Sequence, residues 1–257
     1  MKDDWDPTLY LKFRAERTQP SKDLVARIEV DNPQDIIDIG CGPGNSTRVL
    51  RERWPKARIV GLDRSEAMLE EAREGYPQGE WVRGDASDLE KGRGYDVVFS
   101  NAVIQWVPDH RRLIPSMMAM VKEGGALAVQ IPSVKYAPLH HLMVELGRDE
   151  RYRDHTRGCD ELLEFHDADI YYDLLSPTSR RMEMWETIYY HELRDHEDLI
   201  EWYRATGMKP YLESIPDEPT KRAFAQDLLA LARRTFPKQG NGRVIYPFRR
   251  LFFIAYR

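Results

Sequence analysis

The sequence has few cysteines, no long apolar run and no excess of basic residues. Cys41 and Cys159 are its only cysteines and lie far apart without metal-ligand spacing, which argues against a disulfide framework and a zinc site. No apolar run approaches the roughly 18–20 residues that cross a bilayer, so no membrane partner is predicted. The 38 Lys and Arg against 43 Asp and Glu give a net charge of −5, which argues against a nucleic-acid partner.

The first ten residues, MKDDWDPTLY, are acidic and polar. A signal peptide would be basic and then apolar, so we expect a cytoplasmic protein. The hydrophobic fraction of 42% and the charged fraction of 32% are typical of a folded chain. A length of 257 residues is sufficient for one large α/β domain.

Short apolar runs alternate with amphipathic segments through the first two-thirds of the chain, which predicts a parallel sheet wrapped by helices. Strands are predicted at residues 36–39, 58–62, 81–82, 95–100 and 126–131. Helices are predicted at 46–53, at 65–73 with Ser65 as N-cap, and at 111–121, where Glu123-Gly124-Gly125 should end the helix.

The pattern changes after Pro132. A helix is predicted at 138–147, then an acidic and aromatic stretch at 160–175, a strand at 181–193, helices at 197–204 and 221–235, and a final strand at 246–256. No Gly/Ser-rich or Pro-rich linker separates these segments, so we predict one domain over 1–257. Its parts are an N-terminal lid (1–30), a cofactor-binding core (31–133), a helical insertion (134–180), and C-terminal strands and helices (181–257).

The most informative stretch is a glycine-rich turn that follows the first strand. Gly40, Gly42 and Gly44 let a strand turn sharply into a helix whose free N–H groups face a ligand. A dinucleotide site has the pattern G-x-G-x-x-G, whereas here the third glycine comes one residue early. Asp38 would repel a pyrophosphate but suits a ligand that carries an ammonium group.

This acid-x-G-x-G-x-G pattern resembles the class I S-adenosylmethionine-dependent methyltransferases. The resemblance implies S-adenosylmethionine as cofactor without a metal, and a Rossmann-like, mostly parallel seven-stranded sheet. It also implies an antiparallel C-terminal strand and a helical insertion over the active site. Asp63 ends the second strand about 20 residues after the turn, where Rossmann-like folds bind ribose hydroxyls. The full set of expected cofactor-binding residues is Arg17, Asp38, Gly40, Gly42, Gly44, Asp63, Arg64, Met68, Asp85, Ala86, Asn101 and Trp106.

Six of these residues have specific expected roles. Asp38 would hold the methionine ammonium, and Arg17 would grip the methionine carboxylate. Asp85 and Ala86 resemble the family pair that reads the adenine edge. Met68 would cover the adenine face, and Asn101 ends the fourth strand at the ligand-binding edge of the sheet.

Further segments resemble the trans-aconitate 2-methyltransferases along nearly the whole chain. They include residues 5–11, 16–17, 38–47, 101 with 105–110, 127–130, 171–173, 185–187, 189–191, 206–207 and 249–257. Arg64 and the stretch 148–159 depart from the family pattern. The resemblance implies methyl transfer to a carboxylate oxygen of a small tricarboxylic acid. A carboxylate is ionised at neutral pH, so we assign no general base and expect catalysis by positioning, with Gln105 and Trp106 touching both reactants.

The remaining carboxylates of the acid need cationic or hydroxyl partners. Candidates are His110, Tyr171, Tyr172, Trp185, Tyr190, His191 and Arg249. One alternative is another small-molecule methyltransferase of this fold, acting on a malonyl thioester or a quinone precursor. A nicotinamide-dependent oxidoreductase is disfavoured by the glycine spacing, and a non-catalytic cofactor-binding regulator stays open. We expect a monomer or a weak homodimer.

Overall fold

The computed structural model describes residues 14–88, 94–204 and 206–257, with the side chains of 14–17 and 135 excepted. Contacts divide these residues into two compact units. The sheet unit comprises 14–132, 163–187 and 251–257, and the helical unit comprises 133–162 and 188–250. The helical insertion expected over 134–180 coincides with neither unit, because its second half, from Leu163 on, belongs to the sheet unit.

One seven-stranded sheet runs in the order β3-β2-β1-β4-β5-β7-β6. Its strands are β1 (Asp35–Ile39), β2 (Arg58–Asp63), β3 (Glu80–Arg83), β4 (Tyr95–Asn101), β5 (Val121–Pro132), β6 (Arg181–Leu193) and β7 (Val244–Tyr256). β1 to β5 pair in parallel. β7 is antiparallel to β5, since Gly124 N–H bonds to Arg257 O at the start of β5 and Ser133 N–H bonds to Arg249 O just past its end. The predicted antiparallel C-terminal strand is confirmed.

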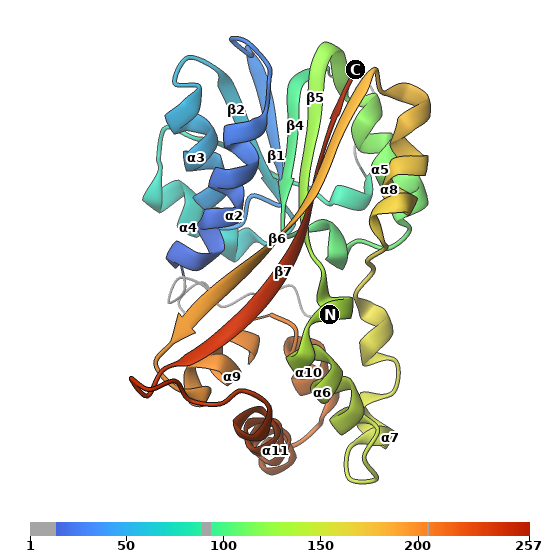
Figure 1. Cartoon of the computed structure of the whole chain (residues 1–257). Coiled ribbons are helices and arrows are strands. Elements are labelled where there is room, and N and C mark those ends of the chain that lie inside the picture. The colour runs from blue at the N-terminus through green and yellow to red at the C-terminus, as the bar shows by residue number, and fades with distance from the viewer. Residues whose placement is uncertain (1–13, 89–93, 205) are drawn as a thin grey trace. The chain divides into compact units, whose positions relative to one another are not determined.

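Helices cover both faces of the sheet unit (Figure 1). α2 (Arg14–Arg27), α3 (Asn45–Arg53) and α4 (Glu66–Gly75) lie on one face, and α5 (His110–Ala119) and α8 (Ala168–Leu175) on the other. The core on the α5 side is built from Val98, Leu113, Met117, Tyr171 and Phe253. β1 is buried along Ile36–Ile39, as a strand covered on both faces should be.

The predicted end of the helix before β5 is wrong. α5 ends at Ala119, and Gly124 and Gly125 lie inside β5. The pairing of β4 with β5 advances from Tyr95↔Val121 to Val97↔Ala126, so the strand bulges there. Gly124 has a φ of 81°, which glycine adopts without strain, and this explains its place in a bulge rather than at a helix end.

The helical unit contains α6 (Pro138–Gly147), α7 (Arg153–Thr156), α9 (His196–Arg204), α10 (Lys209–Ser214) and α11 (Glu218–Thr235). Phe224 of α11 is fully buried and contacts two rings, with its centroid 5.0 Å from Tyr152 and 5.7 Å from Tyr211. Among the described residues, no helix combines the length and apolar character that a membrane crossing needs.

Candidate functional site

The glycine turn lies where β1 ends and α3 begins. Gly40, Gly42 and Gly44 have φ values of 72°, 53° and 81°, a region that side chains with a Cβ rarely adopt. Gly44 precedes α3 and supplies no side-chain cap, so the first N–H groups of the helix are left for another acceptor. The predicted turn from strand to helix is thus observed with three left-handed glycines.

Gly40 is also required for space. A Cβ on Gly40 would lie 2.2 Å from Val103 Cγ2, closer than side-chain carbons approach. Val103 follows Ala102, whose φ of 58° is a strained value for a non-glycine residue. A Cβ on Gly42 would meet nothing within 4 Å, so the backbone at Gly42 is open to a ligand.

Asp38 lies fully buried on β1, just before the turn. Its Oδ2 accepts hydrogen bonds from Ser46 Oγ (2.7 Å) and Thr47 Oγ1 (2.6 Å). Its Oδ1 is buried without a hydrogen-bond partner among the described residues. Burial raises the pKa of Asp38 to about 6, although the two hydroxyl donors lower it and Asp63 raises it further. A buried carboxylate with one free oxygen is suited to a cationic hydrogen-bond donor.

Asp63 ends β2 and buttresses the turn. Its Oδ2 accepts from Gly42 N–H (2.9 Å) and its Oδ1 from Ser65 N–H (2.9 Å). Burial raises the pKa of Asp63, and these two hydrogen bonds and the charge of Arg64 oppose that rise. Each carboxylate oxygen keeps a second lone pair, so Asp63 can still accept from a ligand hydroxyl.

Two further buried acceptors lie at the end of β4 and in the turn that follows it. Asp38 pairs with Phe99 in the sheet register, so Asn101, two residues on, faces the same side of the sheet one pleat nearer its carboxyl edge. Asn101 Oδ1 and Gln105 Oε1 are buried without hydrogen-bond partners among the described residues. Gln105 Nε2 donates to Ala102 O (2.7 Å), which fixes the amide orientation. Trp106 lies half-buried in the same short helical turn, Ile104–Trp106.

The remaining residues predicted for the cofactor have varied environments. Met68 of α4 and Ala86 are buried. Asp85 is exposed, and its Oδ1 accepts from Ser87 N–H and Oγ. Partial burial raises the pKa of Asp85, but these bonds and the charge of Arg64 bring it below its usual value. Arg17 is part of α2, and its side chain lies outside the described residues.

Two of the residues predicted to contact the acid, His110 and Tyr171, are fully buried in the sheet unit. His110 Nδ1 pairs with Tyr171 Oη (2.8 Å), and its Nε2 pairs with Ile104 O (2.7 Å). Because the carbonyl can only accept, Nε2 carries the hydrogen and Nδ1 accepts from the tyrosine. Burial lowers the pKa of His110 and raises that of Tyr171, so both are neutral near pH 7. These polar atoms are used internally, and we leave both residues out of the acid-binding set.

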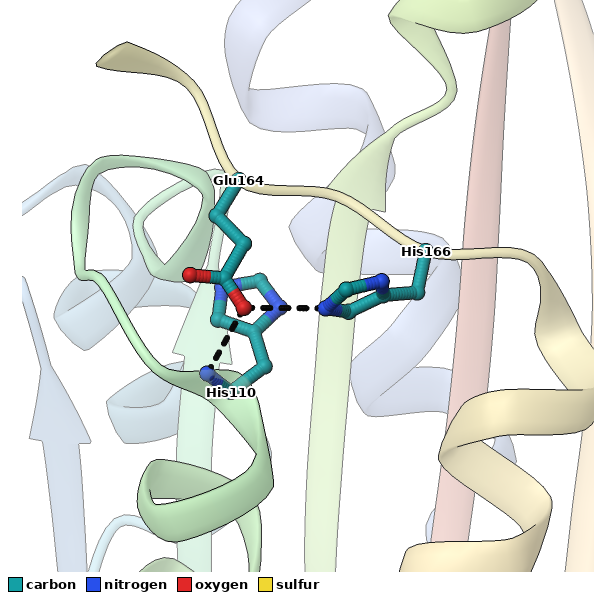
Figure 2. Close-up of side chains that lie close together, drawn as sticks. All are labelled: His110, Glu164 and His166. Carbon is teal, nitrogen blue, oxygen red and sulfur yellow. Dashed lines mark hydrogen bonds and ion pairs between the residues drawn. The ribbon is translucent and has the colours of Figure 1, made fainter. Parts of the chain in front are cut away.

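A carboxylate from the segment before α8 caps α5 (Figure 2). Glu164 accepts Asp109 N–H (2.6 Å) and His110 N–H (2.9 Å), and it pairs with His166 Nε2 (2.9 Å). The ligand atoms of His110, Glu164 and His166 lie within 4.8 Å of one another, which is the spacing of a metal site. Both ring nitrogens of His110 already have partners, however, so the cluster fits a helix cap, with the negative charge at the helix N-terminus.

The other predicted acid contacts are divided between the two units. In the sheet unit, Trp185 has the Arg27 guanidinium over its ring at 4.2 Å and stacks with the ring of Phe252 at a centroid distance of 5.0 Å. Tyr172, also in the sheet unit, is 51% exposed. In the helical unit, Tyr190 is 69% exposed, and the Arg249 guanidinium lies 5.0 Å over Tyr136.

His191, in the helical unit, is buried against Trp202 with a centroid distance of 4.6 Å. Its burial, together with the charge of Arg250, lowers the pKa of His191 to about 4. A neutral imidazole would give a carboxylate no charge–charge attraction, so we also leave His191 out of the acid-binding set.

Sequence reasoning missed several residues of the site. Ser46 and Thr47 donate hydrogen bonds to Asp38, and the side chain of Val103 packs against Gly40. Trp81 of β3 packs so closely that a Cβ on Gly44 would lie 2.7 Å from its ring. Ser46 and Thr47 could have been found from the sequence, because two hydroxyl residues stand in the first helical turn after the glycines. The contacts Gly40–Val103 and Gly44–Trp81 join residues 63 and 37 positions apart, so no local sequence pattern predicts them.

Comparison with known proteins identifies the family. The methyltransferase domain family matches residues 36–125. The chain is 40% identical over 254 residues to the trans-aconitate 2-methyltransferase of Enterobacter sp. (strain 638), covering 99% of this chain and 98% of that protein. The chain belongs to the trans-aconitate 2-methyltransferase family. It is also 39% identical, with the same coverage, to the family member of Escherichia coli (strain K12 / DH10B).

Solved structures show the same fold. YcgJ of Bacillus subtilis superposes with a TM-score of 0.58 at 15% identity, covering 93% of this chain and 99% of that one. Phosphoethanolamine N-methyltransferase 2 of Haemonchus contortus gives a TM-score of 0.57 at 15% identity, covering 93% and 52%. This member of the trans-aconitate 2-methyltransferase family is therefore a class I methyltransferase that uses S-adenosylmethionine, as predicted.

The residues present fit this cofactor. The amino-acid part of S-adenosylmethionine carries an ammonium, and Asp38 Oδ1 is a buried, unpartnered anionic acceptor at the edge where class I folds bind ligands. Asn101 Oδ1 and Gln105 Oε1 add neutral acceptors. Asn45, the first residue of α3, has a buried amide whose two polar atoms also lack partners among the described residues, and its NH₂ suits a carboxylate.

Since we assign Asp38 to the ammonium of the cofactor and its pKa is raised, we expect cofactor binding to depend on pH. An ammonium favours the ionised carboxylate, so the proton that Asp38 gains below about pH 6 must leave when S-adenosylhomocysteine binds. Affinity should be constant above about pH 7 and about ten-fold lower at pH 5, near one decade per pH unit. Calorimetry from pH 5 to 8 measures this. Adenosine, which lacks the ammonium, should bind without that fall, and a flat profile for S-adenosylhomocysteine would contradict the assignment.

A second prediction concerns the buried His110–Tyr171 pair. Tyr171→Phe leaves His110 Nδ1 unpaired inside the core, which should lower the free energy of unfolding by about 1–3 kcal/mol. The KM for the acid substrate should not change, because neither side chain is placed to bind it. Urea unfolding and initial rates give the two readouts. A raised KM with unchanged stability would return Tyr171 to the acid-binding residues.

Proposed function

We propose that this methyltransferase transfers the methyl group of S-adenosylmethionine to a carboxylate oxygen of trans-aconitate, giving a monomethyl ester. The observation that carries the proposal is the 40% identity over 254 residues to relatives named for that reaction. The identity extends through both units, including 133–162 and 188–250, rather than stopping at the residues that match the methyltransferase domain.

Methyl transfer to a carboxylate requires that the two reactants be positioned, and it requires no proton transfer. An O–CH₃ bond forms as the methyl–sulfur bond breaks, and the sulfonium charge is neutralised by the electron pair it receives. The attacking carboxylate is already ionised at neutral pH, so no side chain need act as a base. This agrees with Asp38 being held by Ser46 and Thr47 at β1 and assigned to the cofactor rather than to the acid.

The local geometry supports the cofactor-binding residues that we propose. When bound, S-adenosylmethionine supplies an electrophilic methyl group. Asp38 Oδ1 accepts from its ammonium, and Asn101 and Gln105 offer further acceptors. Asp63 holds the glycine turn through Gly42 N–H and accepts ribose hydroxyls with its remaining lone pairs.

The other assignments are proposals of the same kind. Gly40, Gly42 and Gly44 bring the backbone close to the ligand, and Trp106 and Gln105 orient the reactants. The residues proposed to complete the cofactor site are Arg17, Arg64, Met68, Asp85 and Ala86.

For the acid, we retain the predicted residues that expose a polar group. These are Tyr172, Tyr190 and Arg249, of which Arg249 is the only cation. An arginine can grip a carboxylate with two parallel hydrogen bonds. A cytoplasmic location and a monomer or weak homodimer stay predictions from the sequence.

Incubation with methyl-labelled S-adenosylmethionine and a panel of acids tests the proposal. The panel contains trans-aconitate, cis-aconitate, isopropylmalate and citrate. We expect base-labile label on trans-aconitate with the highest kcat/KM of the four. Label on none of them would remove carboxyl methylation, and base-stable label on a quinone precursor would favour the alternative methyltransferase.

A further inference from the structure

The helical unit contains a cavity that the methyltransferase chemistry does not use. Its volume is about 630 Å³, in the range of small-ligand sites, and its lining residues come from 157–162, 210–214 and Lys221. All of them belong to the helical unit. None of the residues assigned above to the cofactor or the acid lines this cavity.

The interior of the cavity is weakly polar. Leu162 and Pro210 supply apolar surface, and Cys159 is buried beside them with its Sγ 3.7 Å from Pro210 O and 3.4 Å from Ser214 Oγ. Burial raises the pKa of the Cys159 thiol, so it is neutral and does not repel an anion. Leu162 is 50% exposed, so its side chain offers apolar surface at the cavity.

The charges around this apolar surface favour an anion. Arg157 is exposed, and it makes no hydrogen bond or ion pair with the rest of the described chain. Lys221 is paired only with Glu218, a largely exposed partner at 2.9 Å. Such surface pairs are worth little, so the ammonium is available to a second anion. The one acid that lines the cavity, Glu213, lies 3.7 Å from the ammonium of Lys209, which offsets its charge.

We propose that this cavity binds a small monocarboxylic acid with an apolar body. Arg157 and Lys221 hold the carboxylate, and Cys159, Leu162 and Pro210 contact the apolar part. A single unpaired guanidinium beside apolar surface matches one negative charge, whereas a tricarboxylic acid would leave further charges facing Leu162 and Pro210. The cavity is thus an accessory site, separate in its residues from those of methyl transfer.

Benzoate is the probe, with benzamide as its uncharged counterpart. Both are titrated into the ¹⁵N-labelled full chain saturated with S-adenosylhomocysteine, and the amide signal of Gly158, which lines the cavity, is followed by NMR. We expect saturable benzoate binding with a Kd of about 1 mM or below, and benzamide binding at least about five-fold weaker. The readout does not depend on catalysis, so its failure would leave the proposed methylation untouched.

Three variants define the site. Arg157→Ala should weaken benzoate at least about five-fold and leave benzamide unchanged. Arg153→Ala, an exposed arginine on α7 that does not line the cavity, is the matched control and should change neither. Leu162→Trp should fill the cavity and remove binding of both probes. An unshifted Gly158 signal at about 20 mM benzoate, or equal benzoate affinity in Arg157→Ala, would overturn the proposal.

Discussion

Asp38→Asn is expected to weaken S-adenosylhomocysteine binding by about 100-fold, while raising the stability of the cofactor-free protein at pH 7. Affinity should fall because the carboxylate that we assign to the ammonium loses its charge, and a buried charged pair is worth several kcal/mol. Stability rises because burial lifts the pKa of Asp38 to about 6 from 3.8, so ionised Asp38 costs the folded state up to about 3 kcal/mol at neutral pH.

The sign of this effect depends on pH. The penalty on wild-type Asp38 is complete above about pH 6, declines as pH falls from 6 to 3.8, and disappears below 3.8, where the carboxyl is protonated in both states. The advantage of Asp38→Asn should therefore shrink between pH 6 and pH 4. Calorimetry with S-adenosylhomocysteine and urea unfolding at several pH values measure both effects. Asp154→Asn, an exposed change on α7, is the control and should alter neither. Unchanged affinity in a folded Asp38→Asn protein would mean that the ammonium binds elsewhere.

Gly40→Ala is the substitution with the largest expected loss of stability. The φ of 72° costs a residue with a Cβ about 1–2 kcal/mol, and the contact with Val103 Cγ2 adds overpacking of about 1–3 kcal/mol. The variant should lose about 3 kcal/mol of unfolding free energy, as measured by urea unfolding. Cofactor affinity should fall with it, since the turn must shift to relieve the contact.

Two variants separate backbone strain from the contact. Gly42→Ala has a φ of 53° but open space, so it should lose only about 1 kcal/mol. Val103→Ala removes the methyl groups that a Cβ at position 40 would strike. Val103→Ala should lower the unfolding free energy less in the Gly40→Ala protein than in the wild type, because there it relieves the overpacking. Equal losses for Gly40→Ala and Gly42→Ala would show that the contact contributes nothing.

The central strands of the sheet could be predicted because they are buried on both faces. A continuous run such as Ile36-Ile37-Asp38-Ile39 closed by glycines leaves few alternatives. The start of α4 was predictable from Ser65, whose side chain accepts from Met68 N–H. The division into two units was not, since the sequence carries no linker and the division depends on contacts between distant segments.

The candidate site, too, could be predicted from the sequence only in part. Asp38 and the three glycines form a local pattern with a direct chemical meaning, and all four have the expected geometry. The acid contacts were chosen by residue type, which does not reveal burial or pairing. Trp185 is in contact with the Phe252 ring and the Arg27 guanidinium, and His110 uses both ring nitrogens within the core. Only the folded chain distinguishes such residues from ones that are open to a substrate.

The product of the reaction tests the account most directly. The protein is incubated with trans-aconitate and S-adenosylmethionine carrying a ¹³C-methyl group, and the products are followed by NMR. We expect one ¹³C-methyl ester per molecule of acid, formed together with an equal amount of S-adenosylhomocysteine and hydrolysed by mild base. Absence of a methylated product with folded, cofactor-binding protein, or a methyl group that resists base, would contradict the proposed carboxyl methylation.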